Sequence, residues 1–524
     1  MDSTVQPPAE PRVRLIIGAV AVTLLLASLG QTIVATALPT IVSDLGGLDH
    51  LSWVVIAYLL SGTVVAPIYG KLGDLYGRKV VLQIAIVIFL AGAALSAVAS
   101  SMTFLIAART VQGLGGGGLM VIAMAVVADI IPPRQRGRIQ GVLGGVFGVS
   151  TVVGPLLGGF IVEHFSWRWI FLVNLPIGVA ALLVIAAALK ARPERVAHKI
   201  DYPGFALLTG TLSALVLYTS LGGNTFPWGA PMMIVLLVVA VLCLVLFVWV
   251  ESRAEEPVMP LSLFRNNTFV VTSAVGFIVG MAMFGSITFL PLYLQVAKGV
   301  SPTGSGLQLL PMMVGLIGAS MLSGMVMSRT GRYRWLPIAS TAVLVAGMLL
   351  LGTMEIDTPD WQVGVYMLLA GIGIGPVMTV SMTATQNAVD RSIVGVATAG
   401  MTMFRQIGGS IGVSVFGAIF SNRLAAEFAA LGMGGHSGAG GFRREMIAAL
   451  PEPMRTGVLE AFASALHPVF WVAGAAAAVA CLIAFRLREI PLSNTLRREP
   501  EAEIDAEEAA AAGAAGAPAY AAPR

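Results

Sequence analysis

The stretch GKLGDLYGRK at residues 70–79 is a short charged turn between two long apolar segments. A second turn of the same shape, GMVMSRTGRYR, occupies residues 324–334. Each turn contains two glycines seven positions apart and an arginine directly after the second glycine: Gly70, Gly77 and Arg78 in the first, and Gly324, Gly331 and Arg332 in the second. A turn that recurs after 254 positions indicates that the chain contains two copies of one structural unit.

The composition places these turns in a membrane protein. Of the 524 residues, 57% are hydrophobic and 11% are charged, and the mean hydropathy is +0.87, whereas soluble proteins are about one quarter charged. A helix needs about 20 apolar residues to cross a bilayer. Fourteen segments meet that requirement, with centres near residues 26, 60, 90, 116, 150, 180, 212, 241, 281, 315, 344, 371, 409 and 477. We therefore expect an all-α integral membrane protein with 14 transmembrane helices.

The positive charges predict the orientation. The loops on one side of the expected membrane carry 23 of the 31 Lys and Arg residues, and those on the other side carry 6. Cytoplasmic loops are the ones enriched in Lys and Arg, so both termini and both quoted turns should be cytoplasmic. The net charge of +4 follows from this asymmetry, and no nucleic-acid partner is expected.

Further glycines extend the repeat. Gly113, Gly115 and Gly117 match Gly371, Gly373 and Gly375 at an offset of 258, as Gly137 matches Gly395 and Gly154 matches Gly412. The pattern predicts a cytoplasmic N-terminus (1–12), a six-helix bundle (13–190), a linker (191–267) with two extra helices at about 204–222 and 231–251, a second six-helix bundle (268–490) with a long outer loop (422–466), and a disordered cytoplasmic tail (491–524). Duplicated halves are typical of transporters, whose substrate path lies between the halves.

Several motifs carry a resemblance to a known family. GKLGDLYGRK resembles the loop between spans two and three of the major facilitator superfamily, and AARTVQGLGGG (107–117) is similar to its fourth-span motif. GVFGVSTVVGPLLGG (145–159) resembles the fifth-span motif of exporters. SWRWIFLVNLPIG (166–178) and MFRQIGGSIG (403–412) are similar to the 14-span drug:proton antiporter branch. The resemblance covers about residues 15–490 and implies the major facilitator fold, with spans arranged 6 + 2 + 6.

The first turn is predicted to form a charged cytoplasmic latch. Its two glycines allow close helix approach and a tight turn. Asp74 lies within reach of Arg78, and Asp129 at the inner end of span four is a plausible third member. The alternative is a solvated, positively charged loop. The complete expected latch set is Gly70, Asp74, Gly77, Arg78, Asp129, Gly324, Gly331 and Arg332.

Two cations are expected inside the membrane. A charged side chain is costly there, so such a residue is first interpreted as functional. Arg109 lies within span four, with Gln112 on the same helix face. Arg405 and Gln406 lie in span thirteen. The resemblance ties Arg109 to proton coupling, and we expect Gln31 and Thr32 to line the cavity with Gln31 near Arg109. The alternatives are a snorkelling role for Arg109 and structural pairing of Arg405 with a backbone carbonyl.

A cluster in span five is predicted to act as a hinge. Gly145, Gly154, Gly158 and Gly159 surround Pro155, which lacks an N–H and disturbs a helix. The resemblance implies that this helix seals the cavity between the halves and flexes as the cavity changes from one side of the membrane to the other. Glycine is also common in any membrane helix, which is the alternative interpretation.

One expected group is missing. The antiporter branch usually carries an Asp in the first span where this chain has Gly30, and none of the Asp or Glu residues lies deep within the fourteen segments. Proton coupling therefore needs another group, with Asp74, Asp129 and Glu163 with His164 as candidates. A cavity with two arginines and no acid should favour neutral or anionic amphiphiles over dications, unless aromatic faces such as Trp53, Tyr58 and Phe284 supply cation–π contacts.

The sequence thus predicts a multi-pass exporter of amphipathic small molecules in the bacterial cytoplasmic membrane, acting as a monomer in multidrug efflux and antibiotic resistance. The proton gradient is the expected energy source, without a cofactor or a metal. No nucleotide loop, metal cluster or nucleophile–His–acid set is present in the cytoplasmic segments, so an enzyme is not expected. A dedicated exporter of an endogenous metabolite or lipid is the alternative within transport, and a non-transporting scaffold or receptor is the alternative outside it.

Overall fold

The computed structural model describes residues 10–46, 51–189, 201–222, 226–431 and 451–492. Within these ranges the regular structure is helical, apart from one isolated bridge between Gly222 and Phe226. The expectation of an all-α chain is therefore confirmed. The predicted tail lies outside the described residues from residue 493 onward.

The helices of the first half form a bundle around one apolar core, which includes Leu26, Phe89 and Ile122. Its elements are α1 (Glu10–Thr32), α2 (Val34–Leu45), α3 (Leu51–Tyr76), α4 (Arg78–Ala97), α5 (Met102–Ile130), α6 (Pro133–His164), α7 (Trp169–Leu172) and α8 (Asn174–Ala188). A turn at Ile33 separates α1 from α2, so the first predicted span continues into a second helical segment.

The second half has its own apolar core, which includes Phe289, Met312 and Phe462. Its elements are η2 (Leu261–Arg265), α11 (Asn267–Val296), α12 (Pro302–Gln308), α13 (Leu310–Thr330), α14 (Trp335–Leu351), α15 (Asp360–Ala388), η3 (Arg391–Ile393), α16 (Val394–Ala430) and α18 (Glu452–Ala484). Two further helices, α9 (Tyr202–Leu221) and α10 (Pro231–Glu251), lie between the halves in sequence and match the expected extra pair.

Local sequence signals set the helix ends. Ser101 accepts the Phe104 N–H at the start of α5, and Asp201 accepts the Gly204 N–H at the start of α9, which satisfies backbone donors that lack a partner within the helix. Gly331 ends α13 in the left-handed conformation at φ 71°, where glycine carries no steric cost. Gly77, at φ 86°, joins α3 to α4 in the quoted turn.

Every predicted span centre lies on a helix, but the count of fourteen is not established. Twelve helices of the described residues are long and apolar enough to cross a membrane. The apolar helix α14 is shorter, with 17 residues, and α6, with 32, is not among the twelve. The structure thus confirms a polytopic helical protein, while the number of spans and the side of the termini stay predictions.

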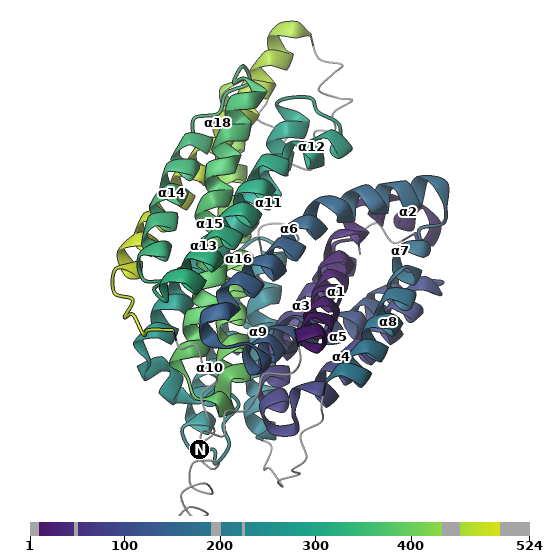
Figure 1. Ribbon diagram of the computed structural model, residues 1–524. Helices are drawn as coiled ribbons and strands as arrows, with labels where there is room; N and C mark the ends of the chain where they lie inside the picture. Colours follow the sequence, from purple (N-terminus) through teal and green to yellow (C-terminus); the bar gives the residue numbers. More distant parts are fainter. Residues whose placement is uncertain (1–9, 47–50, 190–200, 223–225, 432–450, 493–524) are drawn as a thin grey trace, which may run out of the picture.

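The two halves stand side by side (Figure 1). Their helices come together at the end where α3 passes into α4, and they diverge toward the end where α2 and α12 are labelled. We call the end where α3 passes into α4 the latch end. The expected outer loop at 422–466 differs from the structure, because α16 continues to Ala430 and α18 begins at Glu452; residues 432–450 lie outside the described residues.

Candidate functional site

Two charged residues of the first turn, Asp74 and Arg78, meet Asp129 of α5 at the latch end. Arg78 forms an ion pair with Asp74 one helical turn before it, and its Nε lies 3.3 Å from Oδ2 of Asp129. The positive φ of Gly77 turns the chain so that Arg78, at the start of α4, returns over Asp74 at the end of α3. The side chain of Asp74 is 3% exposed and that of Asp129 is 28% exposed. The predicted triad is thus assembled around a buried Asp74.

The Asp74 carboxylate also binds the second half, which sequence reasoning did not predict. Its Oδ1 accepts the N–H of Gly395 at 3.0 Å, and its Oδ2 accepts the N–H of Val396 at 2.8 Å. Both N–H groups belong to the first turn of α16, where the helix dipole and the free donors favour an anion. Asp74 therefore links the two halves at the latch end through a charge-assisted contact.

Two glycine crossings bring the backbones of the halves together at this end. A Cβ on Gly70 would lie 2.7 Å from the carbonyl oxygen of Gly395, and a Cβ on Gly324 would lie 2.2 Å from that of Gly137. Gly70 and Gly324 are repeat partners, as are Gly137 and Gly395. The duplication therefore generates the same contact twice, once between α3 and α16 and once between α13 and α6.

The second turn does not repeat the charged part of the first. Arg332 is exposed and forms no ion pair with any described residue, and the repeat partner of Asp74 is Ser328. The expectation that Arg332 acts as a latch is therefore not met, because the turn lacks the acid. Instead, Arg134 of α6 donates to the carbonyls of Ser328 and Arg329 at 2.8 and 2.7 Å, which caps the C-terminus of α13 from the other half.

A buried polar layer lies between this contact and the centre of the molecule. Gln140 of α6 donates to Gln386 of α15 at 2.8 Å and accepts the hydroxyl proton of Thr383 at 2.7 Å. Gln386 donates in turn to Thr398 of α16 at 3.2 Å. Because buried polar groups cost free energy when unpaired, this network favours contact between the halves.

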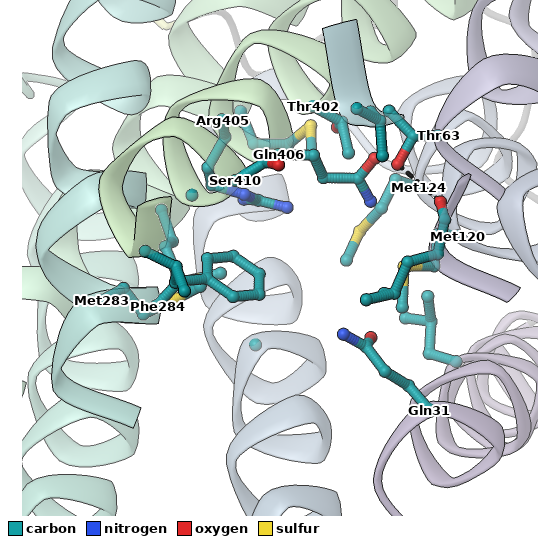
Figure 2. A pocket seen from close by; sticks show the side chains of 18 of the residues that line it. Gln31, Thr63, Met120, Met124, Met283, Phe284, Thr402, Arg405, Gln406 and Ser410 are labelled. Carbon is teal, nitrogen blue, oxygen red and sulfur yellow. Dashed lines mark hydrogen bonds between the residues drawn. The ribbon is translucent and has the colours of Figure 1, made fainter. Parts of the chain in front are cut away.

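A cavity of about 350 Å³ lies above that layer, between the two halves. Methionines and one phenylalanine line much of it: Met120, Met124, Met283, Phe284, Met378 and Met382. Polar side chains complete the wall, including Gln31, Thr63, Gln140, Thr379, Thr402, Arg405 and Gln406. Figure 2 shows Gln31 and Arg405 pointing into the same space from opposite sides. Flexible thioethers adapt to ligands of varied shape.

Arg405 is the only charged residue among the described residues that line this cavity. No hydrogen bond or ion pair joins its guanidinium to another described residue, and the Oε1 atom of the neighbouring Gln406 is buried without a partner. The structure thus places both predicted polar groups of span thirteen at the cavity, with hydrogen-bonding capacity that is not used within the described part of the chain. The guanidinium suits a ligand group that is an anion or a strong acceptor, and the Gln406 oxygen suits a ligand donor.

Arg109 does not lie at this cavity. It donates to the Val54 carbonyl at 3.3 Å and to Oε1 of Gln112 at 2.7 Å, and its guanidinium stacks on the Tyr58 ring at 4.2 Å. Gln31 lines the cavity while Arg109 is held inside the first bundle, and no hydrogen bond joins the two side chains; their approach stays a prediction. The pairing with Gln112 is as predicted.

The neighbours of Gly30 and Thr32 explain the local packing of the first span. A Cβ on Gly30 would approach Phe89 and the Tyr58 hydroxyl at 3.2–3.3 Å, so this position faces the cluster that holds Arg109. Thr32 does not line the cavity; its hydroxyl donates to the Ser150 carbonyl of α6 at 3.1 Å. Thr32 was expected at the cavity, and its hydroxyl serves helix packing instead.

The expected hinge segment forms part of one continuous helix, α6. Its glycines accommodate neighbours: Gly145 faces Ile317 of α13, Gly154 faces Thr32, and Gly158 faces the Ile33 carbonyl. A Cβ on Gly159 would meet no described atom within 4 Å. The side chain of Pro155 lies outside the described residues. These contacts show close packing of α6 on both halves, and flexing of the segment stays a prediction.

The SWRWIFLVNLPIG motif supports α2 at the end away from the latch. Trp167 and Arg168 both donate to Oδ2 of Asp44, at 2.9 and 3.0 Å. These hydrogen bonds lower the pKa of the Asp44 carboxyl below its ordinary value. The contact is therefore present above the ordinary titration range of aspartate and is lost only as the pH falls through the lowered pKa.

Comparison with known proteins agrees with this architecture. Residues 20–413 match the model of the Major Facilitator Superfamily. The chain is 42% identical over 90% of its length to an uncharacterized MFS-type transporter of Mycobacterium tuberculosis, covering 69% of it. It is 38% identical to the multidrug transporter protein MdtP of Bacillus subtilis (78% of this chain, 75% of that protein) and 34% identical to multidrug resistance protein 3 of the same organism (86% and 90%).

Solved structures show the same fold. The human organic anion transporter MFSD10 superposes with a TM-score of 0.62 at 15% identity, covering 91% of this chain and all of that one. The proton:xylose symporter XylE gives a TM-score of 0.61 at 15% identity, covering 93% and 98%. At this identity the likeness concerns the arrangement of helices.

Proposed function

The chain belongs to the major facilitator superfamily, and on that premise we propose that it exports neutral or anionic amphipathic small molecules by alternating access, driven by the proton gradient. In this proposal fourteen helices cross the bacterial cytoplasmic membrane, both termini are cytoplasmic, and the latch end faces the cytoplasm. The proposed substrate class rests on Arg405. This cation has no partner among the described residues and lies in a cavity otherwise lined by methionines and neutral groups. The relatives named as multidrug proteins support an efflux role.

The contacts at the latch end support the alternating-access part of the proposal. Asp74 binds α16, Arg134 caps α13, and the polar layer around Gln140 lies between them and the cavity. In the proposal these contacts close the cytoplasmic path to the cavity. Substrate uptake from the cytoplasm then requires these contacts to break, and outward release requires them to form. The two arrangements are a two-state equilibrium that a ligand can bias.

The glycine crossing gives a first prediction. Gly324→Ala is expected to hold α13 and α6 apart at the latch end, because the new Cβ would lie 2.2 Å from a backbone oxygen. A shift of about 1–2 kcal/mol changes the ratio of two states roughly 5- to 30-fold, so transport should fall within that range. Gly318→Ala on the same helix is the matched control, since a Cβ there meets nothing within 4 Å.

Everted membrane vesicles provide the measurement for this pair. A cysteine placed at Met124 in the cavity, with Cys243 and Cys481 changed to serine, reports access of a membrane-impermeant maleimide from the cytoplasmic face. Labelling should increase in Gly324→Ala and stay at the parent level in Gly318→Ala. Equal labelling in both variants would show that the crossing does not control closure.

The proposed activity itself is tested in everted vesicles with a dye panel that includes a carboxylated dye, its ester and a lipophilic dication. We expect accumulation of the carboxylated dye and the ester, little accumulation of the dication, and loss of accumulation on addition of a protonophore. If flux persists unchanged without a proton gradient, the mechanism is facilitated diffusion and the antiport part of the proposal is wrong. Absence of flux for every amphiphile would overturn the export proposal.

A further inference from the structure

The helix α9 belongs to neither six-helix half, yet it forms part of the cavity wall. Val216, Thr219 and Ser220 of α9 line the same cavity as Arg405 and Gln31. Its partner α10 behaves differently, since most of its side chains are exposed on the surface and only Met233, Ala240, Phe247 and Glu251 are buried. The two extra helices therefore have separate roles, and only α9 reaches the cavity.

Hydrogen bonds join α9 to the part of α16 that carries Arg405. The hydroxyls of Thr219 and Ser410 lie 2.6 Å apart, and the Ser414 hydroxyl donates to the Thr219 carbonyl at 2.5 Å. The Thr219 hydroxyl also lies 3.0 Å from the Val216 carbonyl of its own helix, and either hydroxyl of the Thr219–Ser410 pair can be the donor. Ser410 and Ser414 line the cavity as well. The wall that α9 contributes is thus fixed in position relative to Arg405.

Apolar packing holds α9 against both halves below the cavity. Leu208 and Leu212 of α9 share one buried cluster with Val64 of α3 and with Met403 and Ile407 of α16. The helix α9 thus contacts both halves at this level. Val216, Thr219 and Ser220 are therefore held at the cavity wall in this state.

We propose that α9 is a substrate-recognition helix: Val216, Thr219 and Ser220 limit the bulk of the apolar part of a substrate whose acidic or acceptor group binds at Arg405. The proposal rests on the export of neutral or anionic amphiphiles argued above. It assigns specificity to a span outside the duplicated halves. Since Val216 is small and lies on the wall beside the Thr219–Ser410 pair, a larger residue there reduces the room for the substrate without touching Arg405.

The test uses fluorescent arenecarboxylates that share one carboxylate and differ in ring size, from naphthoate to pyrenecarboxylate. Val216→Phe is expected to lower transport and binding of pyrenecarboxylate by about tenfold or more, a change in line with steric discrimination in apolar pockets, and to change those of naphthoate by less than about twofold. Ala206→Phe, at an exposed position of α9, is the control and should leave both unchanged.

A second pair of variants tests the hydroxyl contact. Thr219→Val removes the pairing with Ser410, and Thr211→Val makes the same change at a buried position two turns earlier, where the hydroxyl donates to the Leu207 carbonyl of its own helix. We expect Thr219→Val to alter the ratio of the two carboxylates and Thr211→Val to preserve it. Binding to purified protein, followed by the ligand's fluorescence anisotropy, keeps the result independent of the transport cycle.

Two outcomes separate this inference from the function on which it rests. If the unmodified protein transports and binds the series but Val216→Phe and Thr219→Val change both carboxylates by one common factor, or change neither, α9 does not select substrates. If the unmodified protein binds none of the arenecarboxylates, the proposed substrate class fails first, and the selective role of α9 fails with it.

Discussion

Replacing Asp74 by asparagine is expected to lower transport by about a hundredfold or more while the chain stays folded and inserted in the membrane. The carboxylate pairs with Arg78 and accepts two backbone N–H groups of α16, and its side chain is 3% exposed. The two N–H groups of α16 are the contacts that cross the halves, and a hydrogen bond to a charged group contributes about 1.5–3 kcal/mol. Weakening both therefore costs about 3 kcal/mol or more, and each 1.4 kcal/mol is about tenfold in an equilibrium. An asparagine keeps the size but not the charge, and it has one side-chain oxygen for the two N–H groups, so the closed latch end loses the charge-assisted contact between α3 and α16.

Asp129→Asn is the matched control for this prediction. Its carboxylate is 28% exposed and lies 3.3 Å from Arg78, which belongs to the same half of the molecule. Partly exposed pairs contribute about 0–1 kcal/mol, so transport should fall less than about fivefold. Vesicle transport and maleimide labelling of the Met124 cysteine are measured together in both variants.

The labelling assay distinguishes a displaced equilibrium from misfolding. Asp74→Asn should be labelled faster than the parent from the cytoplasmic face, because its cavity is open there for a larger fraction of the time. Normal transport in Asp74→Asn would show that the contacts of Asp74 are not needed for transport. Lost transport with unchanged labelling would assign Asp74 a role other than holding the halves together.

The repeat explains how much of the fold could be predicted. The recurrence of Gly70 as Gly324 and of Gly137 as Gly395 indicates two related bundles, and the structure shows these four glycines paired across the halves. The apolar segments fall on helices because each is long enough to satisfy its own backbone hydrogen bonds, which a membrane requires. The same local reasoning located the extra helices α9 and α10, since it depends only on residues close in sequence.

The candidate site was predicted less completely, for a physical reason. The link from Asp74 to α16 uses backbone N–H groups of Gly395 and Val396, and a sequence pattern does not reveal which backbone donors are free to receive a carboxylate. Arg109 and Arg405 look alike in the sequence, since each is a cation within an apolar helix. Only the packing distinguishes them, because Arg109 finds Gln112 and Tyr58 inside one bundle while Arg405 faces the cavity.

The cavity wall on α9 shows the same limit. Val216 and Thr219 are ordinary residues for an apolar helix, and nothing in their spacing indicates a ligand. Their role depends on where α9 settles, between α3 and α16, which follows from the shared cluster around Val64 and Ile407. Long-range packing of this kind decides which of several similar helices reaches the centre of the molecule.

Arg405→Gln is expected to abolish the preference for an acidic substrate. The guanidinium faces the cavity with no hydrogen bond or ion pair to another described residue, so a bound carboxylate would be its partner. Losing one member of a buried charge pair costs about 2–5 kcal/mol. The apparent affinity for a carboxylated dye should therefore fall roughly 30-fold or more, with the larger values for a fully enclosed carboxylate.

A carboxylated dye and its methyl ester form the decisive comparison, because they differ only in the charge. The ester should lose little affinity in Arg405→Gln, since glutamine retains a donor for its carbonyl oxygen. Arg405→Lys keeps the charge but not the planar fork that binds a carboxylate with two hydrogen bonds, so it should retain an intermediate preference for the acid. An equal loss for acid and ester would instead indicate that Arg405 supports the packing of α16, and the assignment of anionic and neutral amphiphiles would then have no charged group to explain it.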